Sequence, residues 1–295
     1  MKGSSKWLIL SLFIMSIGFT ACSSNRYART NKLHDKQVKE VAESIQQPLP
    51  APLPALAESD TLKTDASDLY LPEIAGKRKD LDWVGTINFN MRKPNFIIIH
   101  HTAQDSLQQT LRTFTLKRTQ VSSHYVVSRD GSVYQMLNDY LRAWHAGAGK
   151  WGKVTDMNSA SIGIELDNNG REPFPAVQIT RLLQLLDSLK SQYGIPAQNI
   201  IGHADIAPVR KQDPSVLFPW KTLAEHGFGI WYDTKLIDPP ADFNPELALR
   251  IIGYDTQNLP AAIRAFKRHY IQSDVSAEWT PYDLQVLYNL FLKQK

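Results

Sequence analysis

Cysteine is nearly absent from the sequence: Cys22 is the only one among 295 residues. A lone cysteine excludes an internal disulfide and a zinc site built from several thiolates. Blocks of like charge are also missing and the formal net charge is only +4, so a nucleic-acid-binding arm is not indicated. The composition, with 43% hydrophobic and 21% charged residues, is that of an ordinary globular protein.

The N-terminus has the pattern of an export signal. Two lysines precede an apolar run over residues 7–19, which is too short to span a bilayer comfortably but suits a secretory signal. Small residues then stand directly before Cys22, and this resembles a lipobox, with a signal peptide over 1–21 and lipid on Cys22. An uncleaved anchor or an ordinary signal peptide is the alternative. Because Ser23 is not acidic, we expect an exported protein anchored by lipid to the outer membrane, facing the periplasm.

Residues 22–78 show no persistent periodicity. Prolines alternate with other residues over 47–54, which favours extended polyproline II. We therefore predict a stiff tether between the anchor and a folded domain. A disordered leader would have a similar composition.

Strands and helices are predicted to alternate over residues 79–235. Helical spacing of apolar residues indicates helices over 106–118 and 176–193, and Gly194 ends the second. Asp130-Gly131 between two apolar runs is a hairpin signal. The predicted strands are 96–100, 124–128, 132–136, 161–166 and 199–203. This order predicts an α/β domain with a mixed central β-sheet flanked by helices.

The character of the chain changes over residues 236–295. Asn244-Pro245 and Thr280-Pro281 each place a capping side chain before a proline, the pattern of a helix start. Gly253 ends the first helix, and residues 260–270 form another with apolar residues on one face. We predict a small, separate three-helix bundle.

Two histidines and an aspartate are the candidates for a metal site. His100 and His203 each end a predicted strand, where open sheets place their sites, and Asp213 follows in a proline-rich loop. Two imidazoles and one carboxylate are a common catalytic zinc set. The spacing is not a local signature, however, and a strand-end histidine is more often structural, so these residues alone leave both interpretations open.

Five segments occur in an order that resembles the type 2 N-acetylmuramoyl-L-alanine amidase family, which includes phage T7 lysozyme and the animal peptidoglycan recognition proteins. The segments are Ile98-Ile99-His100-His101-Thr102-Ala103, Ser123-His124-Tyr125, Ala143-Trp144-His145-Ala146-Gly147, Ser161-Ile162-Gly163-Ile164-Glu165-Leu166 and Gly202-His203-Ala204-Asp205-Ile206-Ala207-Pro208. Residues 208–220 look closest to the outer-membrane lipoprotein amidases. The resemblance covers residues 80–225.

The resemblance implies one Zn²⁺ per chain and a role for each matching position. The alternatives from the residues alone are a capped, buried histidine for His145, an exposed glutamate on an edge strand for Glu165 and a solvated loop charge for Lys211. The positions are His100, His203 and Asp213 for zinc, Glu165 and Lys211 for catalysis, and His145 and Trp144 for substrate binding. Where T7 lysozyme has a tyrosine near the zinc, this sequence has Ser123, so Glu165 is expected to carry the proton transfer.

The implied function is hydrolysis of the amide between the muramyl lactyl group and L-alanine, in peptidoglycan or anhydro-muropeptides. Residues 261–270 resemble the central helix of a small peptidoglycan-binding domain, with a purely structural cap as the alternative. A non-catalytic recognition module or a zinc peptidase would be competing functions. Expected partners are muropeptides and, through Cys22, a membrane, but no nucleic acid; the chain is taken as a monomer.

Overall fold

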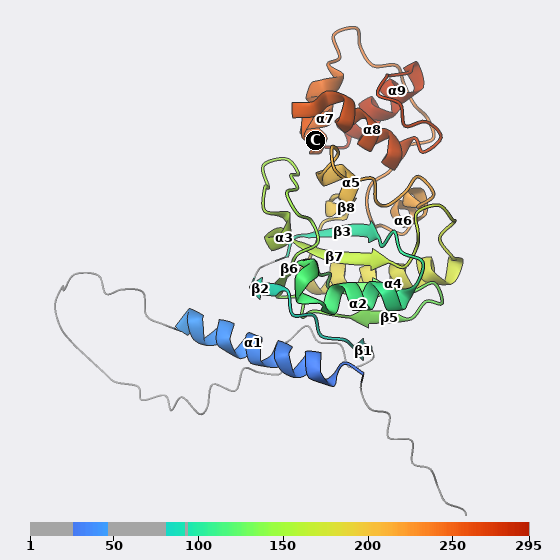
Figure 1. The fold of residues 1–295 in the computed structure, drawn as a ribbon. Coiled ribbons are helices and arrows are strands. Elements are labelled where there is room, and N and C mark those ends of the chain that lie inside the picture. Colours follow the sequence, from blue (N-terminus) through green and yellow to red (C-terminus); the bar gives the residue numbers. More distant parts are fainter. Residues whose placement is uncertain (1–25, 47–80, 92–93, 295) are drawn as a thin grey trace, which may run out of the picture.

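The computed structural model describes residues 26–46, 81–91 and 94–294 (Figure 1). The predicted signal peptide, Cys22 and the proline run lie outside these described residues. Within them, no helix combines the length and apolar character needed to cross a membrane.

A mixed sheet of six strands forms the centre of the molecule, in the order β1-β5-β4-β7-β3-β8. The hairpin β4–β5 is antiparallel, and β3, β7 and β8 run parallel to one another. A second, two-stranded antiparallel sheet pairs β2 with β6. The strands are β1 Asp82–Trp83, β2 Phe89–Met91, β3 Phe96–His101, β4 Tyr125–Val127, β5 Val133–Gln135, β6 Leu141–Ala143, β7 Ser161–Leu166 and β8 Ile200–Gly202. The predicted mixed α/β fold is confirmed.

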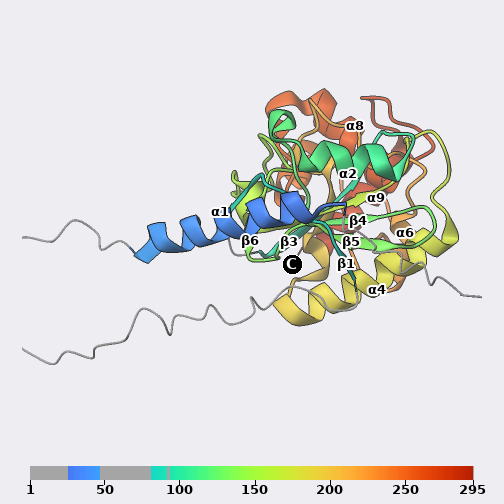
Figure 2. The same ribbon diagram turned by 60° about the horizontal axis from the view of Figure 1, so that its bottom comes forward.

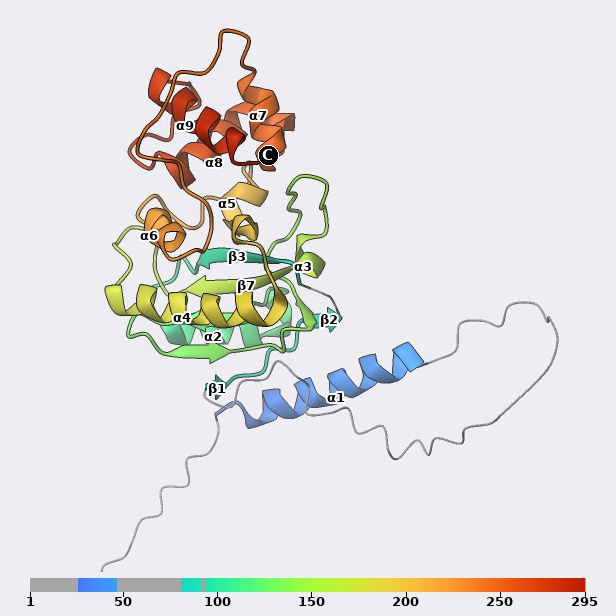
Figure 3. The same ribbon diagram turned by 180° about the vertical axis from the view of Figure 1, so that it is seen from behind.

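Helices cover both faces of this sheet (Figures 2 and 3). Alternate residues of β3 and β7, such as Ile97 and Ile162, pack with leucines of α4 (Ala176–Tyr193). On the other face, α2 (Leu107–Thr115) packs Leu111 against β4 and β5. His100 and Glu165 fall on the face away from α4, because strand side chains alternate.

Several predicted elements end where the capping chemistry places them. The helix predicted over 106–118 is α2, capped by the Ser106 side chain, followed by a 3-10 turn, η1 (Lys117–Thr119). Gly194 ends α4 in the left-handed conformation. His203 does not end strand β8 as predicted; it is the first residue of α5 (His203–Ile206). The other short helices are α3 Met157–Ala160, η2 Ala197–Asn199 and α6 Trp220–Glu225.

Within residues 22–78, predicted as a stiff tether without persistent periodicity, α1 (Ala28–Gln46) is a long helix that the sequence pattern did not indicate. Asn31 accepts a hydrogen bond from the backbone N–H of Gly85 (2.9 Å), and the His34 ring contacts the Thr86 carbonyl (2.7 Å). The helix lies beside β1, at the opposite end of the molecule from the C-terminal helices (Figure 1). Its sequence is polar overall, so few apolar residues mark it as a helix.

The three C-terminal helices form as predicted but do not make a separate core. They are α7 Pro245–Ile252, α8 Leu259–Tyr270 and α9 Pro281–Leu292, with η3 Thr256–Asn258 between the first two. Asn244 and Thr280 cap α7 and α9 as expected. Buried residues of these helices, such as Phe266, share one hydrophobic core with Ile98 of β3. The unit is therefore packed directly on the β8 end of the sheet.

Candidate active site

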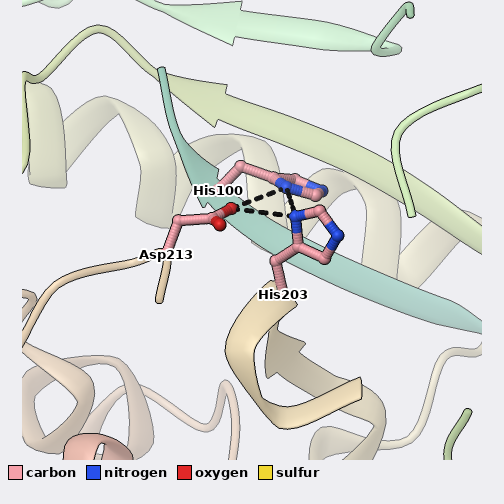
Figure 4. A group of neighbouring side chains, drawn as sticks. All are labelled: His100, His203 and Asp213. Carbon is pink, nitrogen blue, oxygen red and sulfur yellow. Dashed lines mark hydrogen bonds and ion pairs between the residues drawn. The ribbon is translucent and has the colours of Figure 1, made fainter. Parts of the chain in front are cut away.

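His100, His203 and Asp213 meet at the carboxyl ends of β3 and β8, as predicted (Figure 4). The Nδ1 atoms of the two histidines are 2.9 Å apart, and each lies 3.0 Å from Oδ2 of Asp213. Both histidines are buried, whereas the Asp213 side chain is 14% exposed. Three atoms that can each ligate a cation thus converge on one point that solvent reaches from the side of Asp213.

The far side of each imidazole is held by the segment that contains Trp144 and His145. Nε2 of His203 contacts the Ala146 carbonyl at 3.1 Å and must donate to it. Nε2 of His100 lies 2.9 Å from Nδ1 of His145. A neutral imidazole that donates a hydrogen bond from Nε2 keeps its lone pair on Nδ1. These contacts therefore direct the Nδ1 lone pairs of both rings toward Asp213.

Ser161 completes the hydrogen-bond chain behind His100. Its hydroxyl donates to the Met157 carbonyl (2.5 Å), so its oxygen is left to accept from Nε2 of His145 (3.2 Å). Nδ1 of His145 then accepts from Nε2 of His100. Gly163 makes room for the His145 ring, because a Cβ there would lie 2.5 Å from it.

Charge and burial at this cluster suit a cation. Burial, reinforced by the adjacent His203, lowers the pKa of His100 to about 4, so this ring is neutral at pH 7. Burial disfavours the ionised form of Asp213, but the two neighbouring imidazoles hold its pKa well below the usual range. Two imidazoles and one carboxylate are the donor set of a catalytic zinc site. The residues present therefore fit the metal that the sequence predicts.

Glu165 faces the same cluster from the centre of the sheet. It pairs in register with His100 across β7 and β3, and its Oε1 lies 4.0 Å from Nδ1 of His100. The exposed edge-strand alternative is excluded, since β7 lies between β4 and β3. Its Oε2 is buried with no hydrogen-bond partner in the described part of the chain. Burial, then the Asp213 charge, raises the pKa of Glu165 to about 8, against the opposing effect of Lys211.

A cavity of about 240 Å³ opens beside these residues. Lys211 and Trp144, both half-buried, line it together with the three cluster residues and Glu165. His145 also reaches the cavity, but its side chain is buried and hydrogen-bonded to the far side of the His100 ring. This position matches the alternative of a buried, hydrogen-bonded histidine rather than a substrate contact. The cavity thus gathers every site residue predicted from the sequence that lies in the described part of the chain.

Comparison with known proteins agrees with this geometry. Residues 90–216 match the family model described as N-acetylmuramoyl-L-alanine amidase. AmiD of Escherichia coli is 39% identical over 158 residues, 48% of this chain and 56% of AmiD. The solved complex of AmiD with anhydro-N-acetylmuramic acid-L-Ala-D-γ-Glu-L-Lys superposes with a TM-score of 0.61 at 31% identity, covering 68% of this chain and 89% of that one. The chain belongs to the N-acetylmuramoyl-L-alanine amidase family.

Other members of the amidase family extend the match. The 1,6-anhydro-N-acetylmuramyl-L-alanine amidase AmpD of Enterobacter cloacae is 39% identical over 100 residues, 34% of this chain and 54% of AmpD. AmpDh3 of Pseudomonas aeruginosa, solved with an anhydromuramic pentapeptide, superposes with a TM-score of 0.61 at 27% identity, over 69% of this chain and 93% of AmpDh3. The chain spans about half the length of the curated relatives it matches.

Sequence reasoning missed the supporting residues of this amidase-family site. The interpretation of His145 as a substrate contact did not anticipate its place behind His100, and Ser161 was read only as part of a strand. Ser161, Gly163 and Glu165 alternate on one face of β7, and this alternation is the signal that could have placed Ser161 on the same face as Glu165. Ser123 donates to the Gly163 carbonyl inside the core. His101, the last residue of β3, is half-buried beside Gly170 and also lines the cavity.

The raised pKa of Glu165 predicts a pH-dependent stability of the metal-free protein. An ordinary unfolded glutamate ionises near pH 4.3, whereas the folded group holds its proton to about pH 8. The contribution of Glu165 to the free energy of unfolding is therefore fully present below pH 4.3. It declines as the pH rises and is lost once the pH passes about 8. Metal-free Glu165→Gln should exceed wild type in unfolding free energy by about 2–4 kcal/mol at pH 8.5.

Urea unfolding at a series of pH values measures this difference. The gap between Glu165→Gln and wild type should narrow steadily as the pH falls toward 4.5. Glu172→Gln, which removes a partly exposed carboxylate paired with Arg129, is the matched control and should show no such trend. An equal gap at pH 5 and pH 8.5 would show that the Glu165 carboxyl is not protonated by burial.

Proposed function

We propose that this chain is a zinc-dependent N-acetylmuramoyl-L-alanine amidase that hydrolyses the amide between the muramyl lactyl group and L-alanine. The observation that carries the proposal is the position of Glu165. Its carboxyl lies 4.0 Å from Nδ1 of His100, beside three converging metal-ligating atoms and within an open cavity. Three candidate metal ligands, a carboxyl group that can transfer a proton and space for a substrate therefore occur together in one cavity.

His100, His203 and Asp213 would hold the zinc ion and leave its fourth position to water or substrate. Zinc bound there would polarise the scissile carbonyl and lower the pKa of water toward neutrality. The Ala146 carbonyl and His145 keep both imidazole lone pairs directed at the cluster. The protein thus contributes ligands whose orientation is set before any metal binds.

Glu165 is the residue that moves the proton. Its ionised carboxylate accepts a proton from the attacking water and then delivers it to the amine of the departing L-alanine. A pKa of about 8 describes the metal-free site, where burial and Asp213 disfavour the charge. A cation at the cluster favours the ionised form by Coulombic attraction, so the group can act as a base near neutral pH.

Lys211 carries the positive charge that meets the developing oxyanion. It lines the cavity together with Glu165 and Asp213. Lys211→Met should lower kcat by about 10²–10³-fold with a smaller change in KM, because the charge acts mainly in the transition state. Steady-state kinetics measure this split. Lys221→Met, an exposed lysine on α6, is the control and should keep wild-type kinetics.

Muropeptides with an anhydro-muramyl end are the substrates that the solved relatives favour. AmiD was solved with anhydro-N-acetylmuramic acid-L-Ala-D-γ-Glu-L-Lys and AmpDh3 with an anhydromuramic pentapeptide. Trp144, half-buried at the cavity, offers an aromatic surface to the sugar or peptide. A non-catalytic recognition module is less favoured, since Glu165 and Lys211 both face the metal cluster.

Digestion of purified peptidoglycan and of anhydro-muropeptide, with products identified by mass spectrometry, tests the proposed function. The chain without residues 1–22 is suitable, because every described element remains. Stem peptides with a free N-terminal L-alanine, released only without chelator, are the expected products. Cleavage within the stem would favour the peptidase alternative, and retention on the polymer without cleavage would favour the recognition module.

Lipid on Cys22 would anchor this enzyme to the periplasmic face of the outer membrane. The lipobox-like residues before Cys22 and the absence of an acidic residue at Ser23 support the proposal. Labelling of the protein in cells with radioactive palmitate should be lost in Cys22→Ser. Labelling that persists in this variant would exclude Cys22 as the lipid attachment site.

A further inference from the structure

The C-terminal helical unit (α7, η3, α8 and α9) supplies two side chains that hydrogen-bond to the buried carboxylate of Asp205, two residues from His203. Tyr254 donates its hydroxyl hydrogen to Oδ1 of Asp205 at 2.8 Å, and Nδ1 of His269 contacts Oδ2 at 2.8 Å. The backbone N–H of Gly202 donates to Oδ2 at 2.7 Å. Asp205, Tyr254 and His269 are each no more than 3% exposed. A carboxylate so deeply buried needs these partners.

Asp205 belongs to the element that supplies a metal ligand. Helix α5 is a single turn whose first residue is His203, and Asp205 lies two residues further on. The N–H of Ala204 donates to the Asp213 carbonyl at 2.7 Å, so the same turn also holds the loop of the third ligand. One turn has little stability of its own, because most of its backbone groups lack partners within the helix.

Aromatic packing fixes the two groups that hold Asp205. The His269 ring stacks on Trp220 with centroids 3.9 Å apart and an interplanar angle of 15°. The Tyr254 ring meets the edge of Trp151 at 4.9 Å. Trp151 packs so closely on Gly253 that a Cβ there would lie 2.2 Å from the indole ring. Neither partner of Asp205 can turn away without disturbing this packing.

We propose that Tyr254 and His269 are positioning residues for the metal site, acting through Asp205 and helix α5 on His203 and Asp213. The C-terminal helical unit then sets metal affinity and ligand geometry, in addition to any contact with the polymer. The proposal rests on the proposed zinc function. It goes beyond that function because it assigns the metal site a requirement outside the segment that matches the family model, residues 90–216.

Zinc affinity and the visible spectrum of the cobalt-substituted protein test this proposal. The chain without residues 1–22 is compared with His269→Ala and Tyr254→Phe, and zinc affinity is measured by competition with a chromophoric chelator. We expect about 10–100-fold weaker zinc binding in His269→Ala, the range seen for loss of an outer-shell partner, and a smaller loss in Tyr254→Phe. The cobalt spectrum should shift in His269→Ala, since the ligand geometry changes.

Two further variants separate positioning from general stability. His269→Asn keeps an N–H donor near the position of Nδ1 and should recover most of the zinc affinity. Leu290→Ala removes a fully buried side chain from the same core, at a position on α9 that is not a partner of Asp205. It should lower thermal stability and leave zinc affinity and the cobalt spectrum at wild-type values.

Each outcome decides for or against the proposal. Unchanged zinc affinity in His269→Ala and Tyr254→Phe overturns it, as does an equal loss in Leu290→Ala. If His269→Ala does not fold, His269→Asn and Tyr254→Phe carry the comparison. If wild type binds no zinc, the metal function fails first and the positioning proposal fails with it. A normal wild type with unaffected variants removes the positioning proposal alone.

Discussion

Glu165→Ala should retain one zinc ion per chain and lose about 10²–10⁴-fold in kcat, the range that proton transfer by a positioned side chain contributes. The carboxyl lies 4.0 Å from His100 Nδ1 but is not among the three residues whose ligating atoms converge. Its removal therefore takes away the proton-transfer group and leaves the metal ligands in place. Zinc content by atomic emission and kcat on an anhydro-muropeptide are the measurements.

The isosteric Glu165→Gln variant controls for the space left by alanine. Glutamine fills the same volume on β7 but cannot accept and return a proton as a carboxylate does. Both variants should lose turnover to a similar extent, with folding intact by circular dichroism. Near-normal turnover in either variant would remove Glu165 from the proton-transfer role.

Asp213→Ala should lower zinc affinity and activity together, by more than the roughly 10–100-fold that loss of an outer-shell contact costs. Its Oδ2 lies 3.0 Å from Nδ1 of both histidines, and Asp213 is the one carboxylate among the three residues of the cluster. Without it, the two imidazoles remain as the candidate ligands. Zinc affinity from chelator competition and kcat/KM at limiting zinc should fall in parallel.

A neighbouring variant distinguishes ligand loss from loop damage. Gln212→Ala changes an exposed side chain directly beside Asp213 on the same loop and should bind zinc as wild type does. Full zinc occupancy in Asp213→Ala at limiting zinc would exclude Asp213 from the ligand set. A loss in Gln212→Ala as large as that in Asp213→Ala would assign the effect to the loop.

The residues that bring the site together were predictable because they follow strong local patterns. The apolar runs of β3 and β7 and the turn at Gly202 place His100, Glu165 and His203 at one end of parallel strands. Asp213 could be assigned only through the family resemblance, since nothing in its loop fixes where the chain returns to the sheet. The structure supplies that contact through the hydrogen bond from Ala204.

Other features depend on contacts between distant segments and leave little trace in the sequence. Strands β1, β2 and β6 have two or three residues each, too few to show a period, and they lack a turn signal such as the Asp130-Gly131 dipeptide that marks the equally short β4 and β5. Helix α1 is polar, and its place is set by contacts of Asn31 and His34 with residues more than fifty positions away. The bundle was predicted as separate because the caps at Asn244 and Thr280 are local signals. The hydrogen bonds from Tyr254 and His269 to Asp205 join distant segments, and no local signal in the sequence predicts them.

Zinc titration of the metal-stripped protein, with products identified at each point, tests the central claim most directly. Metal is removed with a chelator, zinc is added back in fractions of an equivalent, and cleavage of an anhydro-muropeptide is followed by mass spectrometry. Activity should rise linearly and level off at one equivalent, with every product cut between the lactyl group and L-alanine. Activity that persists without metal, or a cut elsewhere in the substrate, would contradict the account.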